Sequence, residues 1–261
     1  MRLSDGAPPV LVVSRPRNAL IAALDPCDYA FVAPDLTRIC LSRGQIIATA
    51  KQEVDFVCFP EGGVISLSDI LDDGGRVEIG IVGREGMTDP AVLLGCDRAP
   101  YEMAVEVGQH EALLLPADRL YLLCRRSPAA HAVFLRFVQA FMVQIAGTLA
   151  CNLRDSTQKR LARHLLMYHD RIDGDEIDLI HKHIATMLGV RRATVTDCLH
   201  ILEGNQAIRN QRGHIVIRDR ARLEEIAGES YGAAEALWTD HAVRQIRAPQ
   251  LEPLLESLSA A

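Results

Sequence analysis

Short apolar runs separated by turn residues occupy the chain from about residue 36 to residue 115. The runs are 38–41, 45–48, 56–59, 63–70, 76–82, 103–107 and 111–115. Glycine, proline and aspartate lie between them, for example at 60–63 and 72–75, and these residues suit the backbone angles of tight turns. Many short strands at this close spacing predict an antiparallel sandwich or barrel.

Helical patterns flank the predicted strands. Before them, short helices are predicted at 18–24 and 28–33, with Asn18 and Asp28 as N-caps. After them, a helical stretch opens near Pro116. Ser127 followed by Pro128 then starts a long helix over 128–153, because serine suits the N-cap and proline the first helical position. A further helix is predicted over 157–168.

The long helix carries the spacing of a seam between two helices. Its apolar or near-neutral residues alternate in steps of four and three. The predicted dimer contacts are Phe134, Val138, Phe141, Ile145 and Thr148. Packing against its own domain alone is the alternative for such a helix. Other faces also carry Phe137, Met142 and Leu149, so one face can pack on the strands while another meets a second copy of the chain.

Two short helices joined by a glycine turn follow within residues 179–202. Ile184, Met187 and Leu188 define the inner face of the first helix, and the inner face of the second has Val195, Leu199 and Leu202. Gly189 lies between them, where a turn with positive φ favours a residue without Cβ. This arrangement is typical of a helix-turn-helix.

The outward residues of this motif are candidate DNA contacts. They are Arg191, Arg192, Thr194, Thr196 and Asp197, with Lys182 in the first helix as a further candidate. The start of the second helix reaches base edges in such motifs. Arg192 suits a bidentate contact to guanine, and Arg191 a base or a phosphate. Positive charge at a helix N-terminus opposes the helix dipole, so two arginines at this position are unfavourable on their own. A polyanionic partner explains their presence better than a solvated surface does.

Two β-type runs after the second helix predict a hairpin wing. The runs are 207–210 and 214–217, and they surround Gln211, Arg212 and Gly213. Arg212 at the tip is a candidate contact to the DNA backbone beside the recognition helix. Ordinary surface charge is the alternative explanation for this arginine.

Charge is distributed unevenly along the chain. The whole chain of 261 residues has a net charge of −6, but residues 154–222 hold 13 Lys/Arg against 9 Asp/Glu. This segment is therefore at +4 and the remainder at −10. A basic module on an acidic chain is expected where only one part of a protein touches phosphate.

The composition indicates a soluble, cytoplasmic protein. Hydrophobic residues make up 49% and charged residues 24% of the chain, values typical of globular proteins. No stretch approaches the roughly 20 apolar residues that span a bilayer, and the N-terminus lacks the pattern of a secretory signal. We therefore expect no membrane partner. The seven cysteines are scattered without a C-x-x-C pair, which favours structural thiols over a metal or redox site.

The order of these parts resembles the CRP/FNR family of bacterial transcription regulators. The resemblance covers roughly residues 18–230 and includes the runs 83–87 and 188–196. It implies an α+β chain with an N-terminal antiparallel β-roll that resembles a cyclic-nucleotide-binding domain, a long dimerisation helix and a C-terminal winged helix-turn-helix. The expected domains are a β-roll at 18–126, the helix at 127–153, the DNA-binding domain at 154–222 and a tail of uncertain role at 223–261, with helical patterns at 233–247 and 251–258. The family also implies homodimers, palindromic DNA sites, RNA polymerase as a partner and a signal sensed in the β-roll.

The resemblance breaks down where a cyclic nucleotide would bind. Gly83, Glu85, Gly86 and Arg98 form the candidate effector pocket, and Glu85 matches the acidic position of cyclic-AMP-responsive members. The phosphate-binding stretch lacks their Arg-Ser pair, however, and so loses its main charge-assisted contact. We therefore expect no cyclic nucleotide and no other evident cofactor. No cysteine cluster precedes Cys27, which argues against an iron–sulfur centre.

The recognition helix also departs from the cyclic-AMP-responsive pattern. Arg192 matches its first arginine, but Ala193 and Asp197 replace a glutamate and a second arginine. The DNA half-site should therefore differ, with Asp197 either accepting a hydrogen bond from cytosine or pairing with a nearby arginine.

Three classes of function are open to such a chain. A dimeric DNA-binding regulator is favoured, and the alternative is a small-molecule sensor that signals through protein contacts. An enzyme is the third class. No nucleophile–base pair, metal-ligand cluster or phosphate loop stands out, so the sequence predicts neither catalytic residues nor a metal site.

Overall fold

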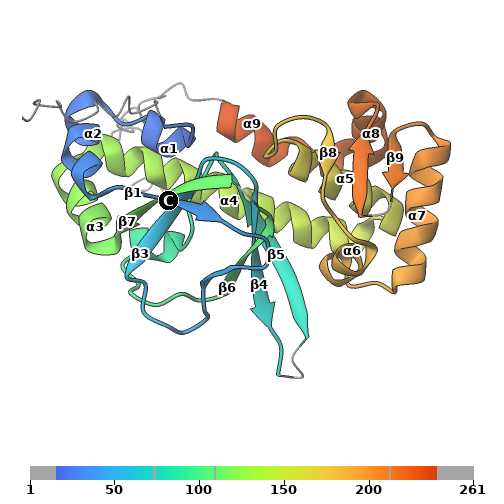
Figure 1. Cartoon of the computed structure of the whole chain (residues 1–261), viewed down its shortest axis with the longest axis horizontal. Coiled ribbons are helices and arrows are strands. Elements are labelled where there is room, and N and C mark those ends of the chain that lie inside the picture. Colours follow the sequence, from blue (N-terminus) through green and yellow to red (C-terminus); the bar gives the residue numbers. More distant parts are fainter. Residues whose placement is uncertain (1–15, 73–74, 109, 212, 240–261) are drawn as a thin grey trace, which may run out of the picture.

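The structure, a computed structural model, describes residues 16–239 apart from 73–74, 109 and 212. The described chain has an α+β fold, with an N-terminal β-roll, one long helix and a C-terminal domain of helices packed on a small sheet. In Figure 1 the two domains lie side by side, and α4 runs from one to the other. The predicted fold class is confirmed.

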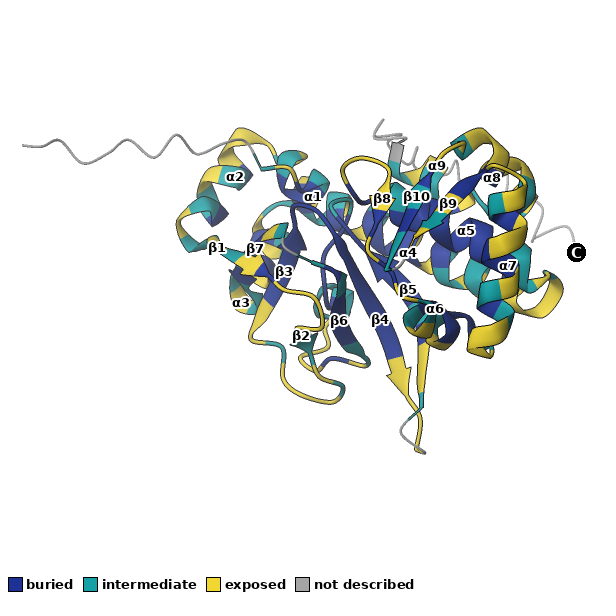
Figure 2. Ribbon diagram, turned by 45° about the vertical axis from the view of Figure 1, so that its right-hand side comes forward, coloured by how far each residue is buried: buried dark blue, intermediate teal, exposed yellow. Residues whose placement is uncertain are grey.

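All seven predicted strands of the β-roll are present. They are β1 (Thr37–Leu41), β2 (Ile46–Ala48), β3 (Phe56–Pro60), β4 (Val64–Ile70), β5 (Arg76–Val82), β6 (Glu102–Val107) and β7 (His110–Pro116). They form two antiparallel sheets, of order β1-β7-β3 and β2-β6-β4-β5. The buried faces of both sheets, including Phe59, Ile65 and Met103, meet in one apolar core. Figure 2 shows this buried interior continuing along β4 until the strand projects into solvent.

Short helices surround the strands. They are α1 (Ala19–Ala22), α2 (Pro26–Val32), η1 (Ala33–Asp35), η2 (Pro90–Leu94) and α3 (Ala117–Arg126). Asn18 caps α1 as predicted. The N-cap predicted for Asp28 is wrong, because α2 begins earlier and Asp25 caps it. Asp28 is instead buried and accepts a hydrogen bond from Ser127 at 2.5 Å, which ties α2 to the start of the long helix.

The long helix α4 (Pro128–Arg154) begins at the predicted Ser127 cap, but its predicted seam faces inward. Phe134, Val138 and Phe141 are buried within their own chain, and the Phe134 ring lies 6.2 Å from that of Phe59. Ile145 and Thr148 are half-buried. The prediction of a dimer contact is therefore corrected at Phe134, Val138 and Phe141, because all three side chains are buried within the same chain, with Phe134 and Phe141 in the β-roll core. At Ile145 and Thr148 the dimer contact stays a prediction.

Gln144 fixes α4 against the edge of a sheet. Strand β5 ends the order of its sheet, so backbone groups of Ile81 are left without a neighbouring strand. The Gln144 Oε1 accepts from the Ile81 N–H at 2.8 Å, and its Nε2 donates to the Ile81 carbonyl at 3.1 Å. Both residues are buried, so this side chain replaces the missing strand for that residue.

The expectation that no stretch of the chain is long and apolar enough to span a bilayer is wrong for α4. By length and composition it is apolar enough to cross a bilayer, with a mean hydropathy of 1.5 over its 18-residue window. The sequence pattern had indicated no such stretch. Core helices of soluble proteins pass the same test, and one side of α4 is packed on the β-roll.

The C-terminal domain contains the predicted helices and a three-stranded sheet. Its elements are α5 (Thr157–His169), β8 (Glu176–Ile177), α6 (His181–Leu188), α7 (Arg192–Gly204), β9 (Ile208–Gln211), β10 (His214–Ile217), α8 (Arg220–Ala227), η3 (Gly228–Ser230) and α9 (Ala233–Thr239). The predicted domain end at residue 222 falls inside α8. Leu223 and Ala227 are buried in the core of this domain, so α8 belongs to it and not to a separate tail.

The C-terminal tail is described only in part. The helix predicted at 233–247 begins as α9, which packs on α4. Residues 240–247 and the helix predicted at 251–258 lie outside the described residues.

Two buried polar contacts join the β-roll to the C-terminal domain. Glu78 of β5 lies 3.2 Å from His164 of α5, and Glu85 lies 2.9 Å from Arg171, just beyond α5. Burial raises the pKa of Glu78 well above its usual range and lowers the pKa of His164 to about 3. Burial therefore favours the uncharged form of both groups at this junction.

All seven cysteines are free, as their scattered spacing predicts. Burial raises the pKa of Cys58 to about 12 and that of Cys124 to about 11. A thiol that stays protonated is a poor nucleophile and metal ligand. These two cysteines therefore serve packing.

Candidate DNA-binding interface

Helices α6 and α7 form the predicted helix-turn-helix. Gly189 ends α6 with φ +63 and ψ 35, in the left-handed region, so the prediction of a positive φ there is confirmed. The Val190 N–H returns to the Ala185 carbonyl at 3.0 Å and closes the turn. Arg160 of α5 also donates to the carbonyl of Leu188, the last residue of α6. These hydrogen bonds fix the turn and tie the end of α6 to α5.

The inner and outer faces of α7 divide as predicted. Val195, Leu199 and Leu202 are buried, whereas Arg191, Arg192 and Asp197 are exposed and Thr194 is half-exposed. Figure 2 shows the outer turns of α7 on the solvent side of the domain. Arg191 is the N-cap residue and provides no side-chain cap. The first backbone N–H groups of α7 therefore lack a side-chain acceptor.

The cations of this surface lack partners within the described part of the chain. Lys182, Arg191 and Arg192 are exposed and form no ion pair there, and neither does Asp197. Other arginines are paired, for example Arg220 with Asp170 at 2.8 Å. The outer face of α6 and the start of α7 thus present three cations without an ion pair in the described residues.

Thr196 differs from the prediction. Its hydroxyl lies 3.1 Å from His181 Nδ1 and 3.2 Å from the Arg192 carbonyl, and the residue is half-buried. The other ring nitrogen of His181 lies 3.4 Å from Asn210 of β9. Thr196 therefore joins the two helices through His181 and has no free hydroxyl proton for DNA. No spacing rule indicated His181, because its partners lie 15 and 29 residues away.

The wing is present as the β9–β10 hairpin. His214 pairs with Gln211 and Ile217 with Ile208 in antiparallel register. Arg212, predicted at its tip, lies outside the described residues. Arg209 and Arg218 beside the hairpin are exposed and, in the described part of the chain, unpaired, whereas Arg222 pairs with Glu225 on α8.

The structure does not assemble the candidate effector pocket. Glu85 accepts from the Gly83 N–H at 3.0 Å and pairs with Arg171. Arg98 instead pairs with Glu53 at 3.1 Å on the exposed side of the β-roll. A Cβ atom at Gly86 would lie 2.2 Å from Phe137, and one at Gly83 would lie 2.6 Å from Arg171. The predicted grouping of these four residues is therefore corrected, because packing against α4 and Arg171 fills the loop.

A cavity of about 320 Å³ does lie beside Glu85. Its walls come from α1, α2, α4 and α9, and they include Arg136, Phe137 and Trp238. Because α9 forms one wall, this cavity depends on the C-terminal segment and is distinct from a pocket formed by the β-roll alone.

Comparison with known proteins agrees with this architecture. Residues 159–226 match the Crp-like helix-turn-helix domain. No curated protein matches the chain. A CRP-family transcriptional regulator from Thermus thermophilus is 20% identical with a TM-score of 0.61, covering 76% of this chain and 99% of that one. A CRP/FNR-family regulator from Eubacterium rectale is 18% identical (TM-score 0.61, 81% and 98% covered), and FixK2 from Bradyrhizobium japonicum is 16% identical (TM-score 0.60, 74% and 98% covered).

The β-roll, the long helix and the C-terminal domain together have the fold of CRP-family transcription regulators, and the match at residues 159–226 supports a DNA-binding role for the helix-turn-helix. The predicted resemblance is confirmed. Residues 159–226 match the Crp-like helix-turn-helix domain, and the described chain as a whole shares its fold with solved CRP/FNR-family regulators.

Proposed function

We propose that this regulator binds palindromic DNA as a homodimer and that the start of α7 reads the bases. The observation that carries the proposal is the pair of exposed arginines, Arg191 and Arg192, at the first turn of the second helix of the motif, without a counter-charge in the described residues. In helix-turn-helix proteins this turn enters the major groove. The phosphates of DNA would supply the counter-charge that the protein itself does not provide to these arginines.

The contacts divide between bases and backbone. Arg192 contacts guanine, and Arg191, Lys182 and Thr194 lie where backbone or neighbouring base contacts are made. The uncapped N–H groups of α7 add a site for a phosphate oxygen, since helix N-termini favour anions. Asp197, exposed and without an ion pair in the described residues, accepts from a cytosine amino group.

The second copy packs against the outer face of α4. Leu135, Met142, Leu149 and Leu153 are exposed on this face, with Met142 at 65%, Leu149 at 61% and Leu153 at 78%. Leu135, Met142 and Leu149 repeat every seven residues, and Leu153 takes the next seam position, which is the spacing of two helices that pack along each other. This stripe lies about a quarter-turn around α4 from the face that the sequence predicts, and it leaves the β-roll core undisturbed.

The proposal keeps the sensing role of the β-roll but assigns it no cyclic nucleotide or other cofactor. Glu85 is paired with Arg171, and the glycine loop around it is filled by Phe137. A signal that changes the Glu85–Arg171 contact reaches the DNA-binding domain directly, because Arg171 follows α5. We further propose that the protein is cytoplasmic, contacts RNA polymerase, has no membrane partner and is not an enzyme.

DNA binding is tested by selecting sites from random duplexes and measuring affinity at several salt concentrations. We expect a palindromic site and a steep salt dependence. Arg192→Ala should lower the preference for the selected base by about 1–3 kcal/mol, or roughly 5- to 150-fold. Arg98→Ala, which removes an exposed arginine from the β-roll, is the matched control and should leave both quantities unchanged. A chain that shows no salt-dependent DNA binding would instead fit a sensor that signals through protein contacts.

The dimer is tested separately by analytical ultracentrifugation. Leu149→Glu places a charge in the exposed stripe and should convert the dimer to a monomer. Leu122→Glu changes an exposed leucine of α3 and should leave the dimer intact. If Leu149→Glu also remains dimeric, α4 is not the interface.

A further inference from the structure

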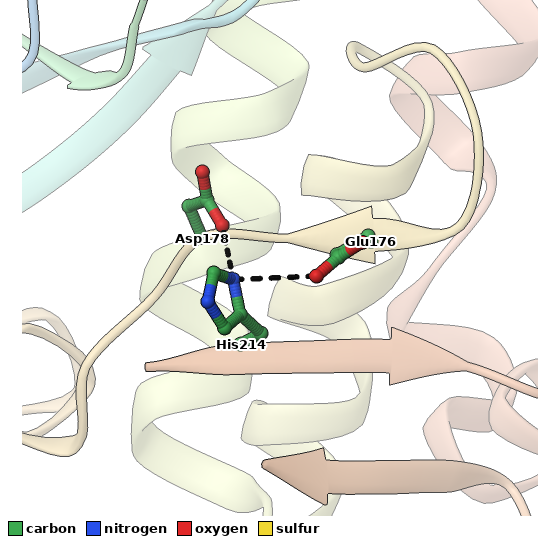
Figure 3. A group of neighbouring side chains, drawn as sticks. All are labelled: Glu176, Asp178 and His214. Atoms are coloured by element: carbon green, nitrogen blue, oxygen red, sulfur yellow. Dashed lines mark hydrogen bonds and ion pairs between the residues drawn. The ribbon is translucent and has the colours of Figure 1, made fainter. Parts of the chain in front are cut away.

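Three side chains with metal-binding atoms meet on the sheet of the DNA-binding domain. Glu176 and Asp178 lie in and just after β8, and His214 begins β10 (Figure 3). His214 Nδ1 lies 2.5 Å from Asp178 Oδ1 and 3.3 Å from Glu176 Oε1, and the three atoms all lie within 4.8 Å of one another. One imidazole nitrogen therefore faces two carboxylates.

The strand register holds these side chains on one face. Ile177 of β8 pairs with Ile215 of β10, and both are buried. Side chains alternate along a strand, so Glu176, Asp178 and His214 all project from the opposite, solvent-facing side. Gln211, which pairs with His214 from β9, projects from the same side.

The charge of the group is unbalanced. Within the described residues, neither Glu176 nor Asp178 pairs with a lysine or arginine, and His214 is the one partner of both. Two carboxylates that share a single imidazole leave a net negative charge even when the ring is protonated. A divalent cation would neutralise that charge and would satisfy all three groups at once.

We propose that Glu176, Asp178 and His214 bind a divalent transition-metal ion of the zinc type. Ligand atoms around zinc lie about 2.0–2.2 Å from the metal, so neighbouring ligands in a tetrahedral site are roughly 3.3 Å apart. The Glu176–His214 separation of 3.3 Å already has this value. Asp178 must move away from His214 Nδ1, which its exposed side chain allows, and Nδ1 must lose its proton to the solvent.

The ligand set favours zinc-like ions over magnesium or calcium. Imidazole nitrogen suits zinc, nickel and copper, whereas magnesium and calcium prefer sites made of oxygen ligands. Three protein ligands leave a coordination position that water or Gln211 would fill. Because the ligands must be deprotonated, binding should weaken as the pH falls.

The ion would join β8 to β10 near the turn of the wing hairpin, where His214 pairs with Gln211. Strand β8 is short, with two residues, and β10 continues through the wing hairpin to β9. A metal bridge between them would fix the direction of the wing and remove negative charge near the proposed DNA backbone contact. This consequence rests on the proposed function, whereas metal binding itself does not.

Metal binding is measured by calorimetric titration of the metal-free full chain with Zn²⁺, and by the absorption spectrum with Co²⁺. His214→Gln and Asp178→Asn should each weaken Zn²⁺ binding at this site at least tenfold. His200→Gln, which changes an exposed histidine of α7, is the matched control and should bind as the unaltered protein does. The Co²⁺ spectrum should lack a thiolate-to-cobalt charge-transfer band, because none of the ligands is a cysteine. Circular dichroism melts confirm that each variant is folded.

Unchanged Zn²⁺ binding in both His214→Gln and Asp178→Asn, or a thiolate band with Co²⁺, would overturn the proposal. The group would then be an ion pair centred on a protonated His214. DNA affinity is measured separately, in EDTA, so that the proposed function is tested without the metal. A protein that binds Zn²⁺ but not DNA would refute only the proposed function. A protein that binds DNA but not Zn²⁺ would refute only the metal site.

Discussion

Arg171 offers a sharp test of how the two domains are held together. It is fully buried, its Nε lies 2.9 Å from Glu85, and its Nη1 donates to the Met167 carbonyl at 2.6 Å. Its guanidinium also lies 4.3 Å from the centroid of the Trp238 ring. One side chain thus connects the loop of the β-roll, the end of α5 and α9.

Arg171→Met keeps much of the volume and removes the charge. The Glu85 carboxylate would remain in a largely buried place without its counter-charge, and breaking a buried pair in this way costs about 3–5 kcal/mol. Loss of the stacking on Trp238 adds roughly 0.5–2 kcal/mol. For a chain of this size, about 2–4 °C of Tm corresponds to each kcal/mol, so a Tm decrease of roughly 7–28 °C is expected.

The assay is thermal and chemical unfolding, each followed by circular dichroism and by tryptophan fluorescence. Trp238 is the single tryptophan of the chain, so its emission reports on the Arg171 contact directly. The double variant Arg171→Met with Glu85→Gln removes both charges and should cost less than the sum of the single variants.

Arg98→Met is the matched control for the loss of an arginine. Arg98 forms an exposed pair with Glu53, and exposed pairs contribute about 0–1 kcal/mol. If Arg171→Met costs no more than this control, or if the two single changes simply add, the buried pair does not couple the domains.

Two further predictions concern buried polar groups. Gln144→Leu leaves the N–H and C=O of Ile81 buried without this partner, at a cost of about 1–3 kcal/mol for each group. Denaturant unfolding should therefore show that the free energy of unfolding decreases by about 2–6 kcal/mol. A decrease below about 1 kcal/mol would contradict the bridging role of Gln144. Burial, together with neighbouring arginines, lowers the pKa of His164 to about 3, below its ordinary value near 6.5 in the unfolded chain. The unfolded state therefore binds the extra proton at this residue, and the contribution of His164 to stability falls as the pH decreases from about 6.5 towards 3. His164→Gln should reduce this slope by up to about 1.4 kcal/mol per pH unit in unfolding experiments at about pH 4–6, and equal slopes would show that His164 is not buried in its neutral form.

The positions of helices and strands could be predicted from local patterns. Each strand of the β-roll was found to within one residue, because the alternation of apolar runs and turn residues acts over a few neighbours. The same holds for the Ser127 cap and for Gly189, where the backbone angle demands glycine. Asp28 was misassigned as a cap because several polar residues near the start of α2 suit that role.

The direction of each helix face was harder to predict. Periodicity shows that α4 has apolar faces, but not which one meets the β-roll. Phe134, Val138 and Phe141 pack inside, and the stripe of Leu135, Met142 and Leu149 remains outside. That choice depends on the shape of the sheets that cover the helix. The inward turn of Thr196 depends in the same way on His181, which lies far from it in sequence.

The sequence by itself determined the order of elements and the helix-turn-helix with its two exposed arginines, because these depend on neighbouring residues. Only the tertiary structure decided which distant polar groups meet. Glu85 meets Arg171, Gln144 meets Ile81, and His214 meets Asp178 from 36 residues away. Such pairs form when separate elements pack together, and no local spacing encodes that packing. The candidate DNA-binding surface could therefore be predicted from the sequence, whereas the filled effector loop and the candidate metal site could not.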